Sequence, residues 1–152
     1  MTTTSGKDAI VAKLRSLPMF TDLDQESVET LAGMVSYKQV PKGAFIVTQN
    51  ERGACMYLLA SGRVKVSLAS PDGKELALNY IEAPGHFGEM SLVDSEPRSA
   101  DVIAVTDVEV LALDGKDLAT AIQMQPRLAL SLIATLSRRL RHTISRLEDM
   151  LG

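Results

Sequence analysis

Apolar side chains near the start of the chain recur at the spacing of a helix. The repeat runs through residues 8–17, where Pro18 disfavours its continuation, and consists of Ile10, Val11, Leu14 and Leu17. A second helix should begin after Asp24, a residue type that caps helices, because apolar positions again recur at helical spacing, at Val28, Leu31 and Val35. We therefore expect helices in residues 1–36 that cover another part of the fold.

The pattern changes to short apolar or alternating runs between residues 37 and 113. Clusters of glycine, proline and charged or polar residues separate these runs, at positions 41–43, 51–53, 61–62, 71–73 and 84–85. This rhythm is typical of an antiparallel sandwich or barrel. The clearest hairpin has Val64, Val66 and Leu68 on one strand, Leu76, Leu78 and Tyr80 on the next, and Pro71-Asp72-Gly73 in the turn. We expect each of these strands to turn one face toward the core.

Helical spacing returns after Leu113. Asp114 can cap a helix, and Pro126 can start a longer one that runs to the end of the chain. The long helix carries a seam of residues spaced alternately by three and four: Ile133, Leu136, Leu140, Thr143, Leu147 and Met150. Helices pair along such seams, so we expect a parallel homodimer held by Ile133, Leu136, Leu140, Leu147 and Met150. The alternative is that the stripe packs on the chain's own strands.

Composition fits one compact domain, because the chain has 152 residues and 45% of them are apolar. The formal net charge of −3 argues against a surface that binds nucleic acid as a whole. One cysteine and two histidines supply neither an internal disulfide nor a ligand cluster for a metal. No leader peptide and no run long enough to span a bilayer are present, so we expect a cytoplasmic protein without membrane contact.

Together these patterns predict an α+β fold in a single domain, residues 1–152. Residues 1–36 hold the N-terminal helices, residues 37–113 an antiparallel β-roll of the jelly-roll type, and residues 114–152 the C-terminal helices, the last being a long dimerisation helix. A loop at residues 85–100 interrupts the strand pattern.

This loop, which we call the cassette, is built to offer backbone donors. Gly85 and Gly88 let the backbone turn tightly and come close to a ligand. A short helix starting near Glu89 or Met90 would direct free N–H groups at an anion. The cassette therefore predicts an anion site.

Two charged side chains of the cassette narrow the anion to a nucleotide. Arg98, just after the rigid turn residue Pro97, adds a planar fork suited to phosphate oxygens. Glu89 would repel a bound phosphate, but a carboxylate can accept a hydrogen bond from the 2′-hydroxyl of a ribose. An arginine for phosphate and a glutamate for ribose indicate a nucleotide.

The sequence FGEMSLVDSEPRSA of residues 87–100 resembles the phosphate-binding cassette of cyclic nucleotide-binding domains of the catabolite activator, or cyclic AMP receptor, family. The resemblance extends from Gly62-Arg63-Val64 to the final helix. It implies that Gly88 and Glu89 hold the ribose, and that Arg98 and Ser99 hold the cyclic phosphate. The cassette residues that it places at the ligand are Phe87, Gly88, Glu89, Met90, Ser91, Pro97, Arg98, Ser99 and Ala100.

The final helix carries a second resemblance to the same family. The run RRLRHT of residues 138–143 is similar to the part of that helix that reaches the base, and Thr143 falls on a threonine that contacts adenine. A hydroxyl in a dry seam needs a partner, which the exocyclic amine of adenine would supply. Arg139 matches an arginine of the same pocket, or is a solvated charge on the helix. Ile144 replaces a serine that serves the neighbouring subunit's ligand, so the resemblance does not extend to that contact.

Three further features are interpreted as structural. His86 lacks a second ligand or acidic partner close in sequence, which favours a solvated loop residue over a catalytic residue or haem ligand. Cys55, in an apolar run, is expected in the core. The basic cluster Arg138, Arg139, Arg141 and Arg146 is followed by Glu148 and Asp149, which favours a charged helix face beside the seam.

The expected function is that of a sensor: a domain that binds cyclic AMP, with cyclic GMP as the other candidate, and that repacks its last helix on binding. We expect no catalytic residue, cofactor or metal. One alternative is the sensor half of a transcription regulator whose winged helix-turn-helix domain is absent from this chain, which has no DNA-reading element. A second alternative is a ligand-free dimerisation scaffold. Arg98 and Glu89 argue against it, because their charges would be costly to bury without a ligand.

Overall fold

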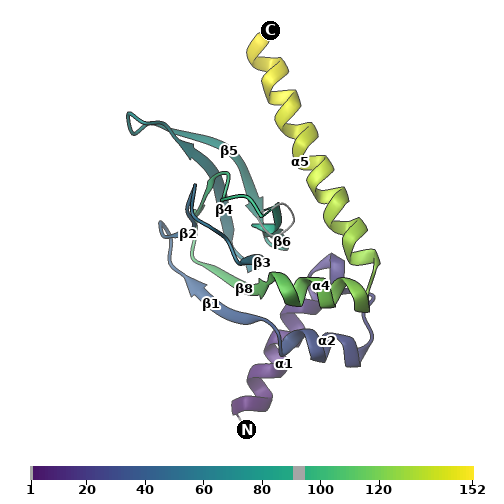
Figure 1. The fold of residues 1–152 in the computed structure, drawn as a ribbon. Coiled ribbons are helices and arrows are strands. Elements are labelled where there is room, and N and C mark those ends of the chain that lie inside the picture. Colours follow the sequence, from purple (N-terminus) through teal and green to yellow (C-terminus); the bar gives the residue numbers. More distant parts are fainter. Residues whose placement is uncertain (1, 91–94) are drawn as a thin grey trace.

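The computed structural model of the protein describes residues 2–90 and 95–152. Strands occupy the middle of the sequence and helices its two ends (Figure 1). The helices are α1 (Thr2–Arg15), the 3₁₀ helix η1 (Pro18–Phe20), α2 (Gln25–Ala32), α4 (Gly115–Met124) and α5 (Arg127–Leu151). The strands are β1 (Ser36–Val40), β2 (Phe45–Val47), β3 (Cys55–Ser61), β4 (Arg63–Ala69), β5 (Glu75–Glu82), β6 (Gly85–Phe87), β7 (Asp101–Ala104) and β8 (Val108–Asp114).

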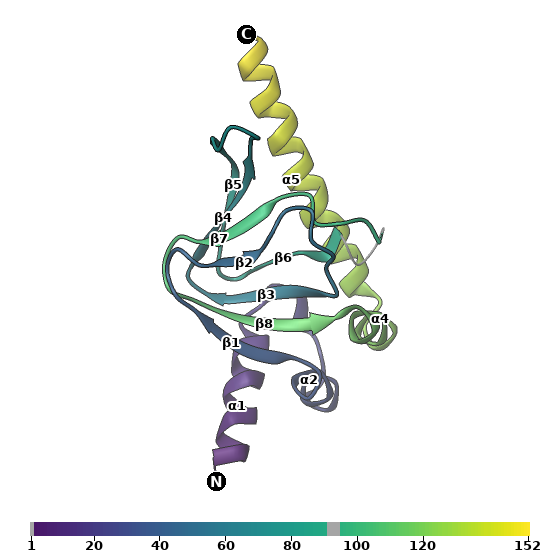
Figure 2. The same cartoon turned by 60° about the vertical axis from the view of Figure 1, so that its left-hand side comes forward.

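The strands form two antiparallel four-stranded sheets, in the orders β1-β8-β3-β6 and β2-β7-β4-β5. The sheets face each other and enclose the interior of the roll (Figure 2). The predicted α+β fold, with an antiparallel β-roll, N-terminal helices and a long C-terminal helix, is confirmed. The short helix expected inside the cassette falls on residues 91–94, which lie outside the described residues.

Strand alternation divides the core into two parts. Met56 and Leu58 of β3 pack with the helices in one cluster, whereas Tyr57 and Leu59 join the cluster inside the roll. This follows from the period of a strand, in which successive side chains point to opposite faces. The helices α1, α2 and α4 therefore cover the outside of one sheet, and the inside of the roll is left to the cassette.

The N-terminal helices match the prediction in type more closely than in extent. α1 spans Thr2–Arg15 instead of residues 8–17, and Leu17 is buried in the turn after it. Asp24 caps α2 as expected, because its carboxylate accepts a hydrogen bond of 2.7 Å from the backbone N–H of Ser27. Val35 lies beyond the end of α2 but is buried, so it belongs to the core without being part of the helix.

The hairpin of β4 and β5 contains a bulge. The register shifts between Val66 and Ser67, opposite which β5 has one extra residue, Leu78. An extra residue reverses the order in which side chains alternate beyond it. The expectation that Leu76, Leu78 and Tyr80 share a core face is therefore wrong: Tyr80 is exposed and its neighbour Ile81 is buried.

Helix α5 leaves the helical cluster and runs beside the roll to the C-terminus (Figures 1 and 2). Its buried residues are Leu128 and Leu132, both near its start. Further along, Arg146 donates a hydrogen bond of 3.0 Å to the carbonyl of Ala77 in β5 and another to the carbonyl of Leu78. Within residues 2–90 and 95–152, no helix is long and apolar enough to cross a membrane.

The seam predicted on α5 is largely exposed. Ile133, Leu140, Leu147 and Met150 each present more than half of their surface to solvent. The alternative that this stripe packs on the chain's own strands is wrong for these four side chains.

Candidate functional site

The cassette begins where β6 ends. Phe87, the last residue of β6, is buried in the roll and stacks on Tyr57, with 5.3 Å between ring centroids. Gly88 follows with a φ of +87°, which L side chains rarely adopt, and a Cβ there would lie 2.9 Å from Nη1 of Arg98. Glycine at this position thus allows both the turn and the close approach of the arginine.

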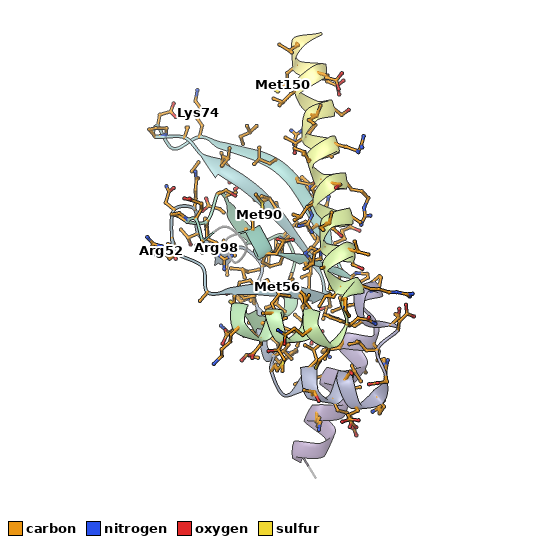
Figure 3. The ribbon with its side chains drawn as sticks, turned by 45° about the vertical axis from the view of Figure 1, so that its right-hand side comes forward. Arg52, Met56, Lys74, Met90, Arg98 and Met150 are labelled. Atoms are coloured by element: carbon orange, nitrogen blue, oxygen red, sulfur yellow. The ribbon has the colours of Figure 1, made fainter. Side chains whose placement is uncertain are left out.

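Arg98 is held at the other end of the cassette by backbone pairing. Its N–H donates to the carbonyl of Glu51, and its own carbonyl accepts from the N–H of Asn50, both at 2.8 Å. Figure 3 shows Arg98 at the roll, with Arg52 farther out on the neighbouring loop. The loop of residues 50–52 therefore fixes where the Arg98 side chain starts.

The guanidinium of Arg98 is enclosed by backbone. It donates to the carbonyls of Gly88 and Cys55, both at 2.6 Å, and a Cβ on Gly53 would lie 2.1 Å from Cζ. The residue is only 7% exposed. A buried cation held by neutral backbone carbonyls provides a strong site for an anion.

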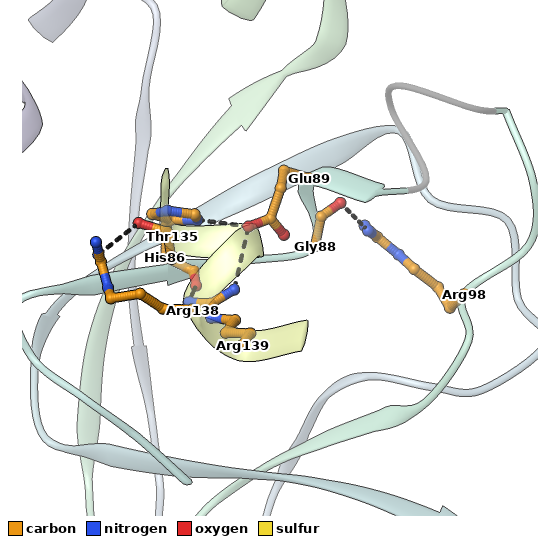
Figure 4. A network of polar contacts seen from close by, with 7 residues as sticks. All are labelled: His86, Gly88, Glu89, Arg98, Thr135, Arg138 and Arg139. Atoms are coloured by element: carbon orange, nitrogen blue, oxygen red, sulfur yellow. Dashed lines mark hydrogen bonds and ion pairs between the residues drawn. The ribbon is translucent and has the colours of Figure 1, made fainter. Parts of the chain in front are cut away.

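Glu89 is buried beside Arg98 but pairs with other residues (Figure 4). Its Oε1 lies 2.6 Å from Nδ1 of His86 and 3.1 Å from Nη1 of Arg139 on α5. Arg139 also donates to the backbone carbonyl of His86. The carboxylate therefore joins the cassette to the long helix.

These contacts keep Glu89 ionised. Burial raises the pKa of a carboxyl group, but the contact with His86 and the charges of His86 and Arg139 outweigh it and hold the pKa of Glu89 below its usual value. Burial lowers the pKa of Arg139, and the ion pair with Glu89 offsets part of that effect. A guanidinium remains charged under these conditions. The solvated alternative for Arg139 is wrong, since its side chain is three-quarters buried against Glu89.

A cavity of about 510 Å³ opens between the cassette, the inside of the roll and α5. This volume is typical of small-molecule sites. The predicted residues that line it are Phe87, Gly88, Glu89, Met90, Arg98, Ser99, Ala100, Arg139 and Thr143. Pro97 does not line it, and Ser91 lies outside the described residues.

The rest of the wall is apolar and was not predicted. It consists of Val47, Val66, Leu68, Leu78, Ile81, Val102, Leu136 and Leu140, with the polar Asn79 beside them. Leu78, the extra residue of the bulge, and Ile81 both reach the cavity, although a regular strand would turn side chains three positions apart to opposite faces. The cavity therefore has a charged end at the cassette and an apolar part between β4, β5 and α5.

Thr143 faces this apolar part with its hydroxyl already paired. Its Oγ1 donates a hydrogen bond of 3.0 Å to the carbonyl of Arg139, one turn earlier in α5. The hydroxyl therefore has a hydrogen-bond partner within α5. The oxygen keeps its lone pairs, so it can still accept from an amine in the cavity.

Two residues that were interpreted as structural from the sequence lie next to the site. His86 belongs to β6 and is 3% exposed, so the interpretation as a solvated loop residue is wrong. Its acidic partner, Glu89, is three residues away. Cys55 is half-buried and not fully in the core, and its carbonyl accepts from Arg98. Burial and the contact with Cys55 raise the pKa of Tyr57 to about 12, so the phenol is neutral beside the cassette at neutral pH.

The arrangement suits a small molecule with one anionic group, a hydroxyl and a flat apolar part. Arg98 would meet the anion, Glu89 a donor such as a hydroxyl, and the aliphatic wall a ring. Among the residues that the structure describes, no group of three His, Cys, Asp or Glu side chains could hold a metal ion.

A match with a known family agrees with this geometry. Residues 37–125 match the family described as "Cyclic nucleotide-binding domain", and the chain belongs to it. The resemblance found in the cassette is thus confirmed.

Two of the relatives are bacterial regulators. The chain is 37% identical over 128 residues to the cyclic AMP receptor protein of Thermus thermophilus, which covers 84% of this chain. It is 29% identical over 133 residues to a CRP-like cAMP-activated global transcriptional regulator of Mycobacterium tuberculosis, which covers 88% of this chain. The chain spans 59% of the length of each of these relatives.

Solved structures share the fold. The catabolite activator protein of Thermus thermophilus superposes with a TM-score of 0.74 at 36% identity, over 88% of this chain and 62% of that one. The N-terminal domain of a transcriptional regulator from Streptomyces coelicolor does so with a TM-score of 0.64 at 33% identity, over 89% of this chain and 94% of that one.

Proposed function

We propose that this chain is a regulatory domain that binds cyclic AMP and performs no catalysis. The observation that carries the proposal is the placement of two buried charges at one cavity: Arg98, whose guanidinium donates to two backbone carbonyls, and Glu89, held ionised. A 3′,5′-cyclic phosphate has a single negative charge, which suits one arginine. Because that phosphate uses the 3′ and 5′ oxygens of the ribose, the 2′-hydroxyl remains free to donate to Glu89.

The parts of the nucleotide would be divided among the lining residues. Arg98 and Ser99 would hold the phosphate, and Gly88 and Glu89 the ribose. Arg139 and Thr143 would lie at the base, with the aliphatic wall on its faces. The remaining predicted cassette residues, Phe87, Met90, Ser91, Pro97 and Ala100, would shape and support the loop.

Adenine is favoured over guanine by the apolar wall and by the names of the relatives. A purine with one exocyclic amine leaves fewer unpaired polar groups against aliphatic side chains than guanine, which has a carbonyl, an amine and a ring N–H. The relative from Thermus thermophilus is named as a cyclic AMP receptor. Cyclic GMP would therefore bind more weakly.

Residues 1–152 would act as a single domain that pairs with a second copy through α5. Ile133, Leu140, Leu147 and Met150 expose a continuous apolar stripe, and Leu136 lies on the same helix beside the cavity. A partner helix would bury such exposed apolar side chains at a and d spacing and thereby stabilise the pair. Since Leu136, Arg139 and Leu140 also line the cavity, a bound base would alter the packing of the paired helices.

Calorimetric titration with cyclic AMP and cyclic GMP tests the ligand. We expect cyclic AMP to bind more tightly, and Arg98→Ala to weaken both nucleotides by at least about 30-fold, because each shares the phosphate. Arg52→Ala removes an exposed arginine from the neighbouring loop and should leave both affinities unchanged. Absence of binding at millimolar nucleotide would refute the proposal.

A second candidate is the sensor half of a longer transcription regulator. It is favoured by the match to the N-terminal domain of the Streptomyces coelicolor regulator, 94% of which this chain covers. The reading frame in the source genome distinguishes the two: a helix-turn-helix sequence after residue 152 supports this candidate, and a stop codon there excludes it.

A further inference from the structure

His86 is a buried side chain next to the site for which cyclic nucleotide binding alone gives no role. It lies in β6 opposite Leu58 of β3, and its imidazole lies beside α5 (Figure 4). A second cavity, of about 430 Å³, is lined by His86, Glu82, Thr135 and Arg138. Neither imidazole nitrogen has a hydrogen-bond partner of regular geometry in the part of the chain that the structure describes, but Nδ1 lies within ion-pair distance of Glu89. The imidazole therefore makes its one close polar contact through Nδ1.

That contact is with Glu89. Nδ1 of His86 lies 2.6 Å from Oε1, and Nη1 of Arg139 approaches the same oxygen at 3.1 Å. An ionised carboxylate can only accept hydrogen bonds, so Nδ1 must carry a hydrogen in this arrangement. A carboxylate has about four acceptor positions, so two side-chain donors on one oxygen leave capacity for a third donor.

The two donors act from opposite sides of the site. Arg139 comes from α5 and His86 from the strand that leads into the cassette. With Arg139 alone, Glu89 could rotate about its own side chain while keeping the ion pair, since one contact does not fix a flexible chain. With both, the position of Oε1 is restrained from two elements, which limits how Glu89 can turn relative to Gly88, where a ribose would lie.

We propose that His86 is a positioning residue that orients Glu89 toward the 2′-hydroxyl of the bound nucleotide, and thereby sets the preference for a ribose over a 2′-deoxyribose. This inference rests on the proposed binding of a cyclic nucleotide. The second link between Arg139 and His86 uses the backbone carbonyl, which every substitution at residue 86 retains. Replacing the side chain therefore removes one donor from Glu89 and leaves the bond from Arg139 to the backbone in place.

The test compares cyclic AMP with 2′-deoxy cyclic AMP, which differ only in the hydroxyl that Glu89 would accept from. The protein should prefer cyclic AMP, and His86→Phe should weaken cyclic AMP by about tenfold while leaving the deoxy ligand unchanged, because the close polar contact that directs the charged Glu89 toward the hydroxyl is lost. His86→Asn has an amide nitrogen at the position of Nδ1 and should keep the preference within about threefold of the original.

Two controls separate a specific effect at His86 from a general effect of the substitution. His142→Phe makes the same change at the chain's other histidine, which is exposed on α5, and should leave the ratio of the two affinities unaltered. Circular dichroism verifies folding, and His86→Met takes the place of His86→Phe if the ring does not fit.

An equal loss for both ligands in the apolar variant would show that His86 has only a structural role, and no change in the ratio would also overturn the inference. A loss of the preference in His86→Asn as large as that in the apolar variant would count against the donor at Nδ1. If the unaltered protein binds neither nucleotide, the proposed function itself fails.

Discussion

Arg139 of α5 and Glu89 of the cassette form an ion pair of 3.1 Å across 50 residues of sequence. It is a direct polar link between the long helix and the site where a nucleotide would bind. Because Glu89 is 2% exposed and Arg139 also donates to the carbonyl of His86, the pair connects the strand, the cassette and the helix at one point.

Removing this arginine should destabilise the fold. Arg139→Ala removes a charged partner of the buried Glu89 carboxylate, and we expect the free energy of unfolding to fall by about 1–3 kcal/mol, less than for a fully buried pair because the arginine side chain is 24% exposed. Arg138→Ala, at the neighbouring and exposed position, should change it by less than about 0.5 kcal/mol. Urea denaturation measures both, and equal effects would contradict the role of the ion pair.

The depressed pKa of Glu89 predicts a pH dependence of stability. A carboxyl group whose pKa is lower in the folded than in the unfolded chain stabilises the fold above its unfolded value, here near 4.5, and this contribution is lost as the pH falls through the folded value. The difference in unfolding free energy between the protein and Glu89→Gln should thus be largest at neutral pH and shrink below about pH 5. Glu148→Gln, in an exposed part of α5, should show a small difference at every pH. A constant gap for Glu89→Gln between pH 7 and pH 4 would refute the prediction.

Gly53→Ala should displace Arg98. The added Cβ would lie 2.1 Å from Cζ of the guanidinium, which is shorter than any tolerated contact. We expect nucleotide affinity to fall about as far as in Arg98→Ala. Gly33→Ala is the matched control, since its Cβ would meet only the carbonyl of Thr30, at 3.4 Å, in a helical conformation. Titration of both variants with nucleotide tests this prediction. Unaltered binding by Gly53→Ala would show that Arg98 reaches its position through another side-chain conformation.

Pairing through α5 can be tested away from the cavity. Leu147 is exposed and does not line the cavity, so Leu147→Asp should yield monomers without direct contact with the ligand. Ser145→Asp places the same charge on an exposed position of α5 outside the seam and should leave the dimer intact. Sedimentation at several concentrations distinguishes the two, and a monomeric unaltered protein would exclude the dimer.

Thr143 should contribute modestly to the choice of base. Its hydroxyl hydrogen is engaged by the carbonyl of Arg139, so the oxygen is oriented to accept, which suits the amine of adenine better than the carbonyl of guanine. Thr143→Ala should weaken cyclic AMP by about 1 kcal/mol and cyclic GMP by less. Thr143→Ser keeps the hydroxyl and should restore the difference. Uniform loss for both nucleotides would place the base elsewhere.

Sequence patterns predicted the features that are local. Asp24 caps α2, and the turn at Pro71-Asp72-Gly73 joins β4 to β5, because caps and turns depend on a few adjacent residues. The bulge at Leu78 could not be predicted, because it is a property of how two strands pair and not of either strand alone.

Seven of the nine predicted cassette residues line the cavity, which follows from their being close together in the sequence. Gly53 was missed as a site residue. It has to be glycine because a Cβ there would collide with the guanidinium of Arg98, which lies far along the chain. His86 was missed for a similar reason: its surroundings include Arg139, 53 residues later. The acidic residue three positions after it is a local signal of a polar partner.

The bulge in β5 also gives the hairpin a mechanical role. A bulge interrupts the regular ladder, and the carbonyls of Ala77 and Leu78 beside it accept from Arg146 of α5. The bulged part of β5 is thereby tethered to the far part of the helix. If α5 turns about its axis, it must carry this part of β5 along or break the two hydrogen bonds, so the hairpin registers the position of the helix.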